Sequence, residues 1–472
     1  MSDSVNTIEK KLRKLQCHFT WELHKDQADL NFLEIKLCES LQSVEEGHGG
    51  HLNRQRLNLL AYIKHLKAED KEALECLEKA ERQNAHDGRL GMVTYGNLAW
   101  VCHYISDDVG AETYIQKLEE LHKASATVGT TVMQSSATAS TSVLPVSREV
   151  HSEKAWSLLT FSKHHYTRAK ECFEGALLLE PEDKEWNLGF AFSLFQLEGL
   201  VTREDQRLSY EVSPAVKQLK KALELNPNSA MTQVYLGLKC YKNLRNAEAW
   251  RYMRTALSLA PYDLSVVLKV GKFMKKEEHY DEALAVLQRM LQRAPNSSRL
   301  HHEMANIYRW KAKQSGDPHN QKLLERCVYH LEKVAQLNPA HIYPQLEMAM
   351  RYSELKDTRK SMEKFQDMWS RSDLKPSDRQ AWHRMYGDFQ LYRLGSERTA
   401  VDHYKEGMRL NNISSEWSHC RRRLLKILRV NIEKRQNDFY DIEEFVNSQG
   451  RGNDVTNAGV TAQSTRMCRT VS

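Results

Sequence analysis

Positive charges recur at helical spacing in the middle of the chain. Lys269, Lys272 and Lys276 are three and four residues apart, which puts them on one face of a helix, with Lys275 beside them. Further basic residues follow one segment later and near the carboxyl end: Arg309, Lys311, Lys313, Arg421, Arg422, Arg423, Lys426 and Arg429. Cations of this kind follow a phosphate backbone while aromatic rings stack on bases, so the pattern favours a groove for single-stranded nucleic acid.

A structural explanation accounts for the same residues. A lysine triplet at helical spacing is more often the solvated side of a helix, and Trp156 at the start of a helix is more often a packing residue. The sequence leaves both interpretations open, an RNA-binding groove and an ordinary solvated or packed helix face.

Other chemistry finds little support. The pairs His164-His165 and His301-His302 have no cysteine or carboxylate partners at ligand spacing, so no metal site is expected. The sequence has no Gly-rich phosphate loop, no nucleophile elbow and no recognisable carboxylate pair. We therefore expect neither an enzyme nor a bound cofactor.

The bulk composition fits a soluble helical protein. The chain has 472 residues, of which 28% are charged, and its net charge of +6 permits nucleic acid as a partner without requiring it. No apolar run reaches membrane-spanning length, and the polar amino terminus lacks the apolar region of a signal peptide. The nine cysteines are scattered without a C-x-x-C pair, which favours a reduced, cytoplasmic location.

A repeat of 34 residues positions these side chains. Three consecutive segments share the same internal offsets: Ala215, Leu219, Ala222, Pro227; Ala249, Met253, Ala256, Pro261; and Ala283, Leu287, Met290, Pro295. The period, the small residues and the closing proline resemble the tetratricopeptide repeat, a pair of helices. The sequence therefore predicts an all-α superhelical solenoid of such repeats, with a positively charged inner channel lined by the first helix of each pair.

The pattern extends along most of the chain. Nine candidate second helices begin near Ala73, Ala111, Ala169, Ala215, Ala249, Ala283, Cys327, Ser361 and Ala400. We expect amino-terminal helices over 1–50, including one over 8–21, helix pairs over 51–123, a flexible Ser/Thr/Ala-rich loop over 124–147, further pairs over 148–412, a basic capping helix within 413–446, and a disordered tail over 447–472.

Segments outside the repeat pattern are more specific. They are Cys17-His18-Phe19-Thr20-Trp21, Asn58-Leu59-Leu60-Ala61-Tyr62, Val93-Thr94-Tyr95-Gly96-Asn97, Leu300-His301-His302 and Tyr386-Gly387. These segments closely resemble the interferon-induced proteins with tetratricopeptide repeats, the IFIT family, over residues 12–435. The resemblance implies a cytoplasmic, interferon-induced antiviral protein that sequesters foreign single-stranded or 5′-marked RNA and inhibits its translation. It also implies self-association or pairing with other family members.

The resemblance suggests particular RNA contacts. Trp156 and Tyr166 stand where relatives place aromatic residues against the first nucleotide or cap, Lys36 where one relative has an arginine near the 5′ end, and His302 where a histidine touches the RNA further along. Lys163 lies close to a phosphate-binding position. With the basic residues above, the candidate RNA-binding residues are Lys36, Trp156, Lys163, Tyr166, Lys272, Lys275, His302, Arg309 and Lys426.

Several positions depart from the family pattern. Thr160 stands where a phosphate-binding lysine is expected, and Gln196 and Leu268 stand where arginines are expected. Glu303 replaces a glutamine with a charge that phosphate would repel, and Met231 replaces an aromatic residue. These losses leave the preferred RNA end-group open. They also favour the alternative function, a repeat scaffold that acts through family members or other protein partners and binds little RNA.

Overall fold

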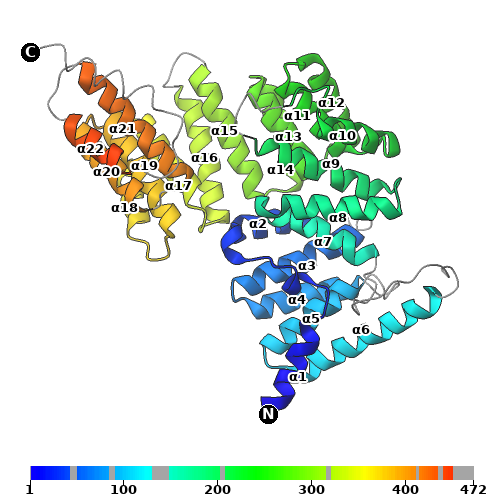
Figure 1. Ribbon diagram of the computed structural model, residues 1–472. Helices are drawn as coiled ribbons and strands as arrows, with labels where there is room; N and C mark the ends of the chain where they lie inside the picture. The colour runs from blue at the N-terminus through cyan, green and yellow to red at the C-terminus, as the bar shows by residue number, and fades with distance from the viewer. Residues whose placement is uncertain are drawn as a thin grey trace, which may run out of the picture. The chain divides into compact units, whose positions relative to one another are not determined.

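The described part of the protein consists of α-helices with a few 3-10 turns in the computed structural model (Figure 1). The structure describes residues 2–42, 50–83, 91–129, 148–201, 208–314, 320–410, 414–433 and 439–449, and these residues form no strand. The chain divides into two compact units, residues 1–303 (unit 1) and 304–472 (unit 2). The predicted all-α repeat fold is confirmed.

Unit 1 begins with helices that precede the repeats and continues with regular pairs. Its elements are α1 (Ser2–Leu12), η1 (His18–Thr20), η2 (Lys25–Gln27), α2 (Leu30–Gln42), α3 (Gly50–Leu66), α4 (Asp70–Arg82), α5 (Met92–Tyr104), α6 (Asp108–Gly129), α7 (Arg148–Phe161), η4 (Lys163–His165), α8 (Tyr166–Leu179), α9 (Lys184–Gly199), α10 (Pro214–Leu225), α11 (Ala230–Lys242), α12 (Asn246–Leu259), α13 (Leu264–Lys276), α14 (Tyr280–Arg293) and the first residues of α15 (Ser298–Gln314).

Unit 2 continues the same alternation. Its elements are the rest of α15, then α16 (Gln321–Leu337), α17 (Ile342–Glu354), α18 (Thr358–Trp369), α19 (Pro376–Tyr392), α20 (Glu397–Leu410), α21 (Ser415–Glu433) and α22 (Phe439–Gln449). Within the described residues of the two units, each of the nine segments expected as second helices lies in an even-numbered helix from α4 to α20.

Small residues at the expected positions let the paired helices pack closely. Ala249, Met253 and Ala256 on α12 are fully buried. A Cβ atom added to Gly237 on α11 would lie only 3.0 Å from the Met253 Cε atom. Asp263 then caps the next helix, because its Oδ1 atom accepts a hydrogen bond of 2.9 Å from the Val266 amide. The repeat motif therefore encodes both the close contact and the helix start.

The amino-terminal segment differs from the prediction. The helix expected over 8–21 ends at Leu12, and His18–Thr20 forms a separate 3-10 turn. Cys17 and Trp21 are buried there, and the His18 imidazole lies 2.9 Å from the Ser157 hydroxyl of α7. Tertiary contacts to this buried turn thus replace the continuous helix.

Two boundaries also differ. Helix α6 continues to Gly129, so residues 124–129 of the expected loop are helical, while 130–147 lie outside the described residues. At the carboxyl end, a second helix, α22, follows α21 and includes residues 447–449 of the expected tail. Ile442 and Val446 are buried in the same core as residues of α20 and α21, which explains why α22 forms. Residues 450–472 lie outside the described part of the chain.

A pair of substitutions on α14 tests the packing. Ala283 is fully buried, whereas Ala285 on the same helix is exposed. We expect Ala283→Asp to lower the free energy of unfolding by about 3 kcal/mol or more, because a carboxylate is placed in an apolar contact. Ala285→Asp, the control, should change it by less than about 0.5 kcal/mol. Urea unfolding followed by circular dichroism measures both, and equal losses would contradict the assigned helix faces.

Candidate nucleic-acid interface

First helices of consecutive pairs lie side by side in unit 1 and carry a row of aromatic rings. Helices α7, α9, α11 and α13 contact one another in this order. The Trp156 ring on α7 is 6.0 Å from that of Phe192 on α9, which is 4.3 Å from that of Tyr235 on α11. The Lys269 ammonium on α13 lies 5.0 Å from the Tyr235 ring centroid. The row therefore ends in a cation.

Most of this aromatic surface is used in packing. Phe192 and Tyr235 are buried, and burial raises the pKa of Tyr235 to about 12. Trp156 is half-buried; its Nε1 atom donates a 2.9 Å hydrogen bond to Glu185, and its ring packs edge-on against Phe173. These contacts fix the Trp156 ring, so Trp156 is a packing residue. The part of the ring that is still exposed is held in one orientation.

Tyr166 and Lys163 lie near the junction of α7 and α8. Tyr166 begins α8 and is half-buried, and burial together with the nearby Tyr235 hydroxyl raises its pKa. Lys163 is exposed in the 3-10 turn between the helices. The structure thus brings Tyr166 toward the aromatic row, whereas it places Lys163 on a surface turn.

Lys272 is exposed to solvent. Its side chain is 59% exposed, yet surrounding protein lowers its pKa, with Lys269 and Arg299 adding to the effect. The structure therefore supports Lys272 as a candidate phosphate contact.

Lys275 and Glu303 neutralise each other. The Lys275 ammonium donates a 2.6 Å hydrogen bond to Glu303, whose side chain is only 5% exposed, and Lys272 lies 3.9 Å from the other carboxylate oxygen. The sequence predicts an RNA contact at Lys275 and a charge that repels phosphate at Glu303. Each of these two side chains is the partner of the other, and the RNA contact of Lys275 stays a prediction.

Four cations from four helices gather in unit 1. Lys36 on α2, Arg56 on α3, Lys269 on α13 and Arg299 on α15 form what we call the interior cation cluster. Burial lowers the pKa of Lys36 to about 8, and Arg299, Lys269 and Arg56 lower it further as neighbouring positive charges. Burial likewise lowers the pKa of the other three. Sequence reasoning missed Arg56 and Arg299, because no spacing links positions so far apart in the chain.

Glu39 holds this cluster in place. Its buried carboxylate on α2 accepts hydrogen bonds from the Ser297 hydroxyl at 3.0 Å and the Arg299 amide at 3.2 Å, and it lies 3.8 Å from the Arg299 Nε atom. These contacts join α2 to the start of α15. The Arg299 guanidinium is held near this carboxylate, and its positive charge lowers the pKa of Lys36, which lies one helical turn before Glu39.

The other residues that the family resemblance singles out differ in burial. His302 on α15 is half-buried and next to the buried His301, whose Nε2 atom lies 3.1 Å from the Pro295 carbonyl oxygen. Thr160 and Gln196 are half-buried and uncharged, and Leu268 is buried. These three positions therefore supply no cation.

Two candidate residues belong to unit 2. Arg309 is 43% exposed and lies 4.0 Å from Glu347, and Lys426 is exposed on α21. They are not part of the interior cation cluster, which unit 1 forms by itself.

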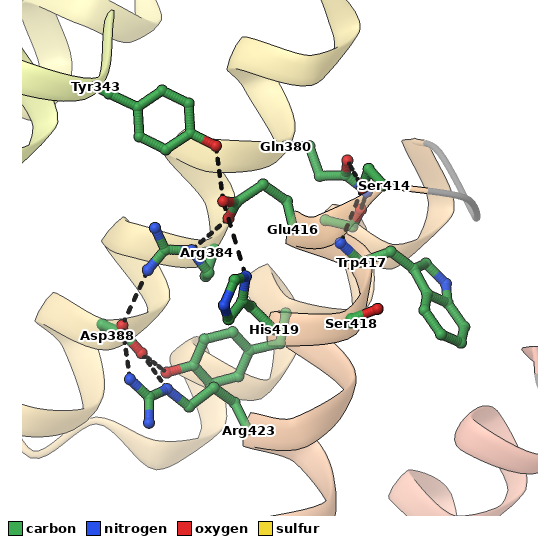
Figure 2. Close-up of polar contacts among 12 residues, drawn as sticks. Tyr343, Gln380, Arg384, Asp388, Ser414, Glu416, Trp417, Ser418, His419 and Arg423 are labelled. Carbon is green, nitrogen blue, oxygen red and sulfur yellow. Dashed lines mark hydrogen bonds and ion pairs between the residues drawn. The ribbon is translucent and has the colours of Figure 1, made fainter. Parts of the chain in front are cut away.

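One basic residue of α21, Arg423, belongs to a polar network with side chains of α19 (Figure 2). Asp388 on α19 accepts hydrogen bonds from the Arg423 guanidinium at 2.8 and 3.1 Å and lies 3.5 Å from Arg384. Glu416 on α21 accepts a hydrogen bond from Arg384 and another, of 2.7 Å, from the Tyr343 hydroxyl. Arg384 and Arg423 thus join helices to one another, whereas Lys426 is left open to solvent.

Removing the charge of Asp388 tests this assignment. We expect Asp388→Asn to lower the stability of unit 2 by about 1–3 kcal/mol, since Arg384 and Arg423 lose an anionic partner in a site where Asp388 is only 10% exposed. Asp402→Asn on the exposed face of α20 is the matched control and should have little effect. Urea unfolding distinguishes them, and equal stability of the two variants would refute the structural role.

Other classes of site are not found in the described part of the chain. No three His, Cys, Asp or Glu side chains there come close enough to hold a metal ion. None of its helices combines the length and the apolar character needed to span a membrane.

Comparison with known proteins identifies the family. No family model matches the sequence. The chain is 30% identical to the human protein "IFIT1 homolog B", over 89% of this chain and 87% of that protein, and 29% identical to the human "Antiviral innate immune response effector IFIT1", over 86% and 84%. The solved structure "Human IFIT1 dimer with m7Gppp-AAAA" superposes with a TM-score of 0.67 at 26% identity, over 98% of this chain and 99% of that one. The chain belongs to the interferon-induced proteins with tetratricopeptide repeats.

Proposed function

We propose that this chain is an antiviral RNA-binding protein that sequesters foreign single-stranded or 5′-marked RNA and inhibits its translation. The observation that carries the proposal is the aromatic row of unit 1, which ends at Lys269 of the interior cation cluster. The family relationship of the chain supports the proposal as well, because structures of human IFIT1 have been solved with capped and with triphosphate-ended RNA. The proposed action is binding alone, without catalysis, and its proposed location is the cytoplasm.

The two kinds of side chain have different tasks in this mechanism. The remaining surfaces of Trp156 and Tyr166 stack on bases, which contributes roughly 1–3 kcal/mol per base. The cations neutralise phosphates and release counterions, which adds about 0.7 to the salt slope for each phosphate of a single strand. A strand held in this way is withheld from the translation machinery.

Self-association is part of the same proposal. The human IFIT1 structures include a dimer and a monomeric mutant, so the relative associates with itself. We extend this property to the present chain, together with pairing with other family members. The alternative function, a scaffold that binds protein partners and little RNA, predicts no retention of RNA ended by triphosphate, cap or monophosphate.

Removing the charge of Lys272 tests whether this residue contacts RNA. We expect Lys272→Gln to weaken binding of a 5′-hydroxyl oligoadenylate about three- to tenfold, because a cation facing the strand is lost. Lys79→Gln, on the exposed face of α4, removes the same charge elsewhere in unit 1 and should leave affinity nearly unchanged. Fluorescence anisotropy at several salt concentrations measures both. An unchanged affinity of Lys272→Gln would remove this residue from the interface.

The pKa of Lys36 predicts a pH dependence. Lys36 is largely protonated at pH 7 and loses its proton as pH rises through about 8. A bound phosphate favours the protonated form, so affinity for 5′-hydroxyl oligoadenylate should fall, roughly fivefold, between about pH 7 and pH 9. The groups that face Lys36 are Arg56, Lys269 and Arg299, and burial lowers the pKa of each of them as well.

A substitution by arginine provides the control. Lys36→Arg keeps a positive charge throughout this range, so its affinity should be nearly constant between pH 7 and pH 9. Anisotropy titrations at each pH measure the effect. If both proteins show the same fall in affinity, the pH dependence comes from another group.

A further inference from the structure

This chain lacks cations at the phosphate positions that its family pattern leads one to expect. Thr160, Gln196 and Leu268 are uncharged, and Leu268 is buried. At the same time, Arg56, Lys269 and Arg299 stand together with Lys36 in unit 1. Positive charge is therefore absent at one set of positions and concentrated at another.

The interior cation cluster carries an excess of positive charge. Among the described residues that interact electrostatically with its four members, the carboxylates are Glu39 and Asp263. Four cations thus face two anions. Like charges that are held together without full compensation destabilise the free protein, and an anionic ligand relieves the repulsion.

Hydrogen-bond donors in the cluster are left over after the internal contacts are made. The Arg299 Nη1 atom is buried and has no hydrogen-bond partner, although its Nε side faces Glu39. In the described part of the chain, no hydrogen bond or ion pair is made to the Lys36 ammonium. The Lys269 ammonium lies over the face of the Tyr235 ring, and no hydrogen bond or ion pair is made to it within the described residues. These donors match the several acceptor oxygens of a phosphate group.

We propose that Lys36, Arg56, Lys269 and Arg299 form a phosphate subsite. Its ligand is a phosphate group of an RNA strand, which comes either from the internal backbone or from the 5′ end. Arg299 is oriented by Glu39, and Lys269 joins the subsite to the aromatic row through Tyr235. This proposal rests on the RNA-binding function proposed above and names the residues that give it affinity.

The test uses the full-length chain and three 3′-labelled oligoadenylates, with 5′-hydroxyl, 5′-monophosphate or 5′-triphosphate ends. The variants are Arg299→Gln, Lys269→Gln and the double variant, with Arg299→Lys as the charge-preserving form. Arg289→Gln, exposed on α14, is the matched control for loss of one charge in unit 1. Affinity is measured by anisotropy at several salt concentrations, and folding by circular dichroism melting.

We expect the double variant to lose at least tenfold in affinity, to lower the salt slope by about 0.7 or more, and to melt like the parent protein. Arg299→Lys should retain most of the affinity. An equal loss for all three oligoadenylates assigns the subsite to an internal phosphate, and a loss confined to the triphosphate form assigns it to the 5′ end. If Arg299→Gln melts early, Lys269→Gln alone decides, since no hydrogen bond or ion pair holds the Lys269 ammonium in the described part of the chain.

Two results would overturn the proposal, and they are distinguishable. If the double variant binds all three RNAs as Arg289→Gln does, the subsite is wrong while the RNA-binding function stands. If the parent protein binds none of the three RNAs, the proposed function fails, and the subsite fails with it.

Discussion

The close contact between helices that follow one another in the chain, both within a pair and between one pair and the next, is the constraint on which the rest of the structure depends. A Cβ atom added to Gly189 would lie 2.2 Å from the Phe173 ring, and one added to Gly387 would lie 2.7 Å from the Tyr404 ring. Small residues therefore set how near α8 comes to α9, and α19 to α20. This approach brings successive first helices side by side, so residues from four repeats can meet along one wall of unit 1.

Positive charge has two separate uses on this scaffold. Arg384, Arg423 and Lys275 are bound to buried or half-buried carboxylates and hold helices together. Lys36 and Arg299, by contrast, are kept near each other although both are positive, and Glu39 compensates only part of their charge. An arrangement of this second kind is unfavourable for folding and is explained more readily by a ligand than by stability.

Sequence reasoning was strongest where contacts are local. The 34-residue period locates the second helices, because an offset of three or four residues and a terminal proline act within one helix. The same offset predicts that Lys272 shares a helix face with Lys269 and Lys276. Sequence reasoning was weaker for Lys275 and Glu303, whose ion pair joins two helices, and it missed Arg56 and Arg299, which become neighbours of Lys36 only when distant repeats pack.

The sequence by itself determined the repeat, the helical class and the family of this protein, since all three rest on short-range periodicity and on segments such as Cys17–Trp21 that are read directly. Tertiary structure alone decided which cations are used. A charge is neutralised or left available according to the side chains that surround it, and these come from helices as distant as α2 and α15. Electrostatic energy depends on separation in space and on burial, and neither is written in the spacing of residues along the chain.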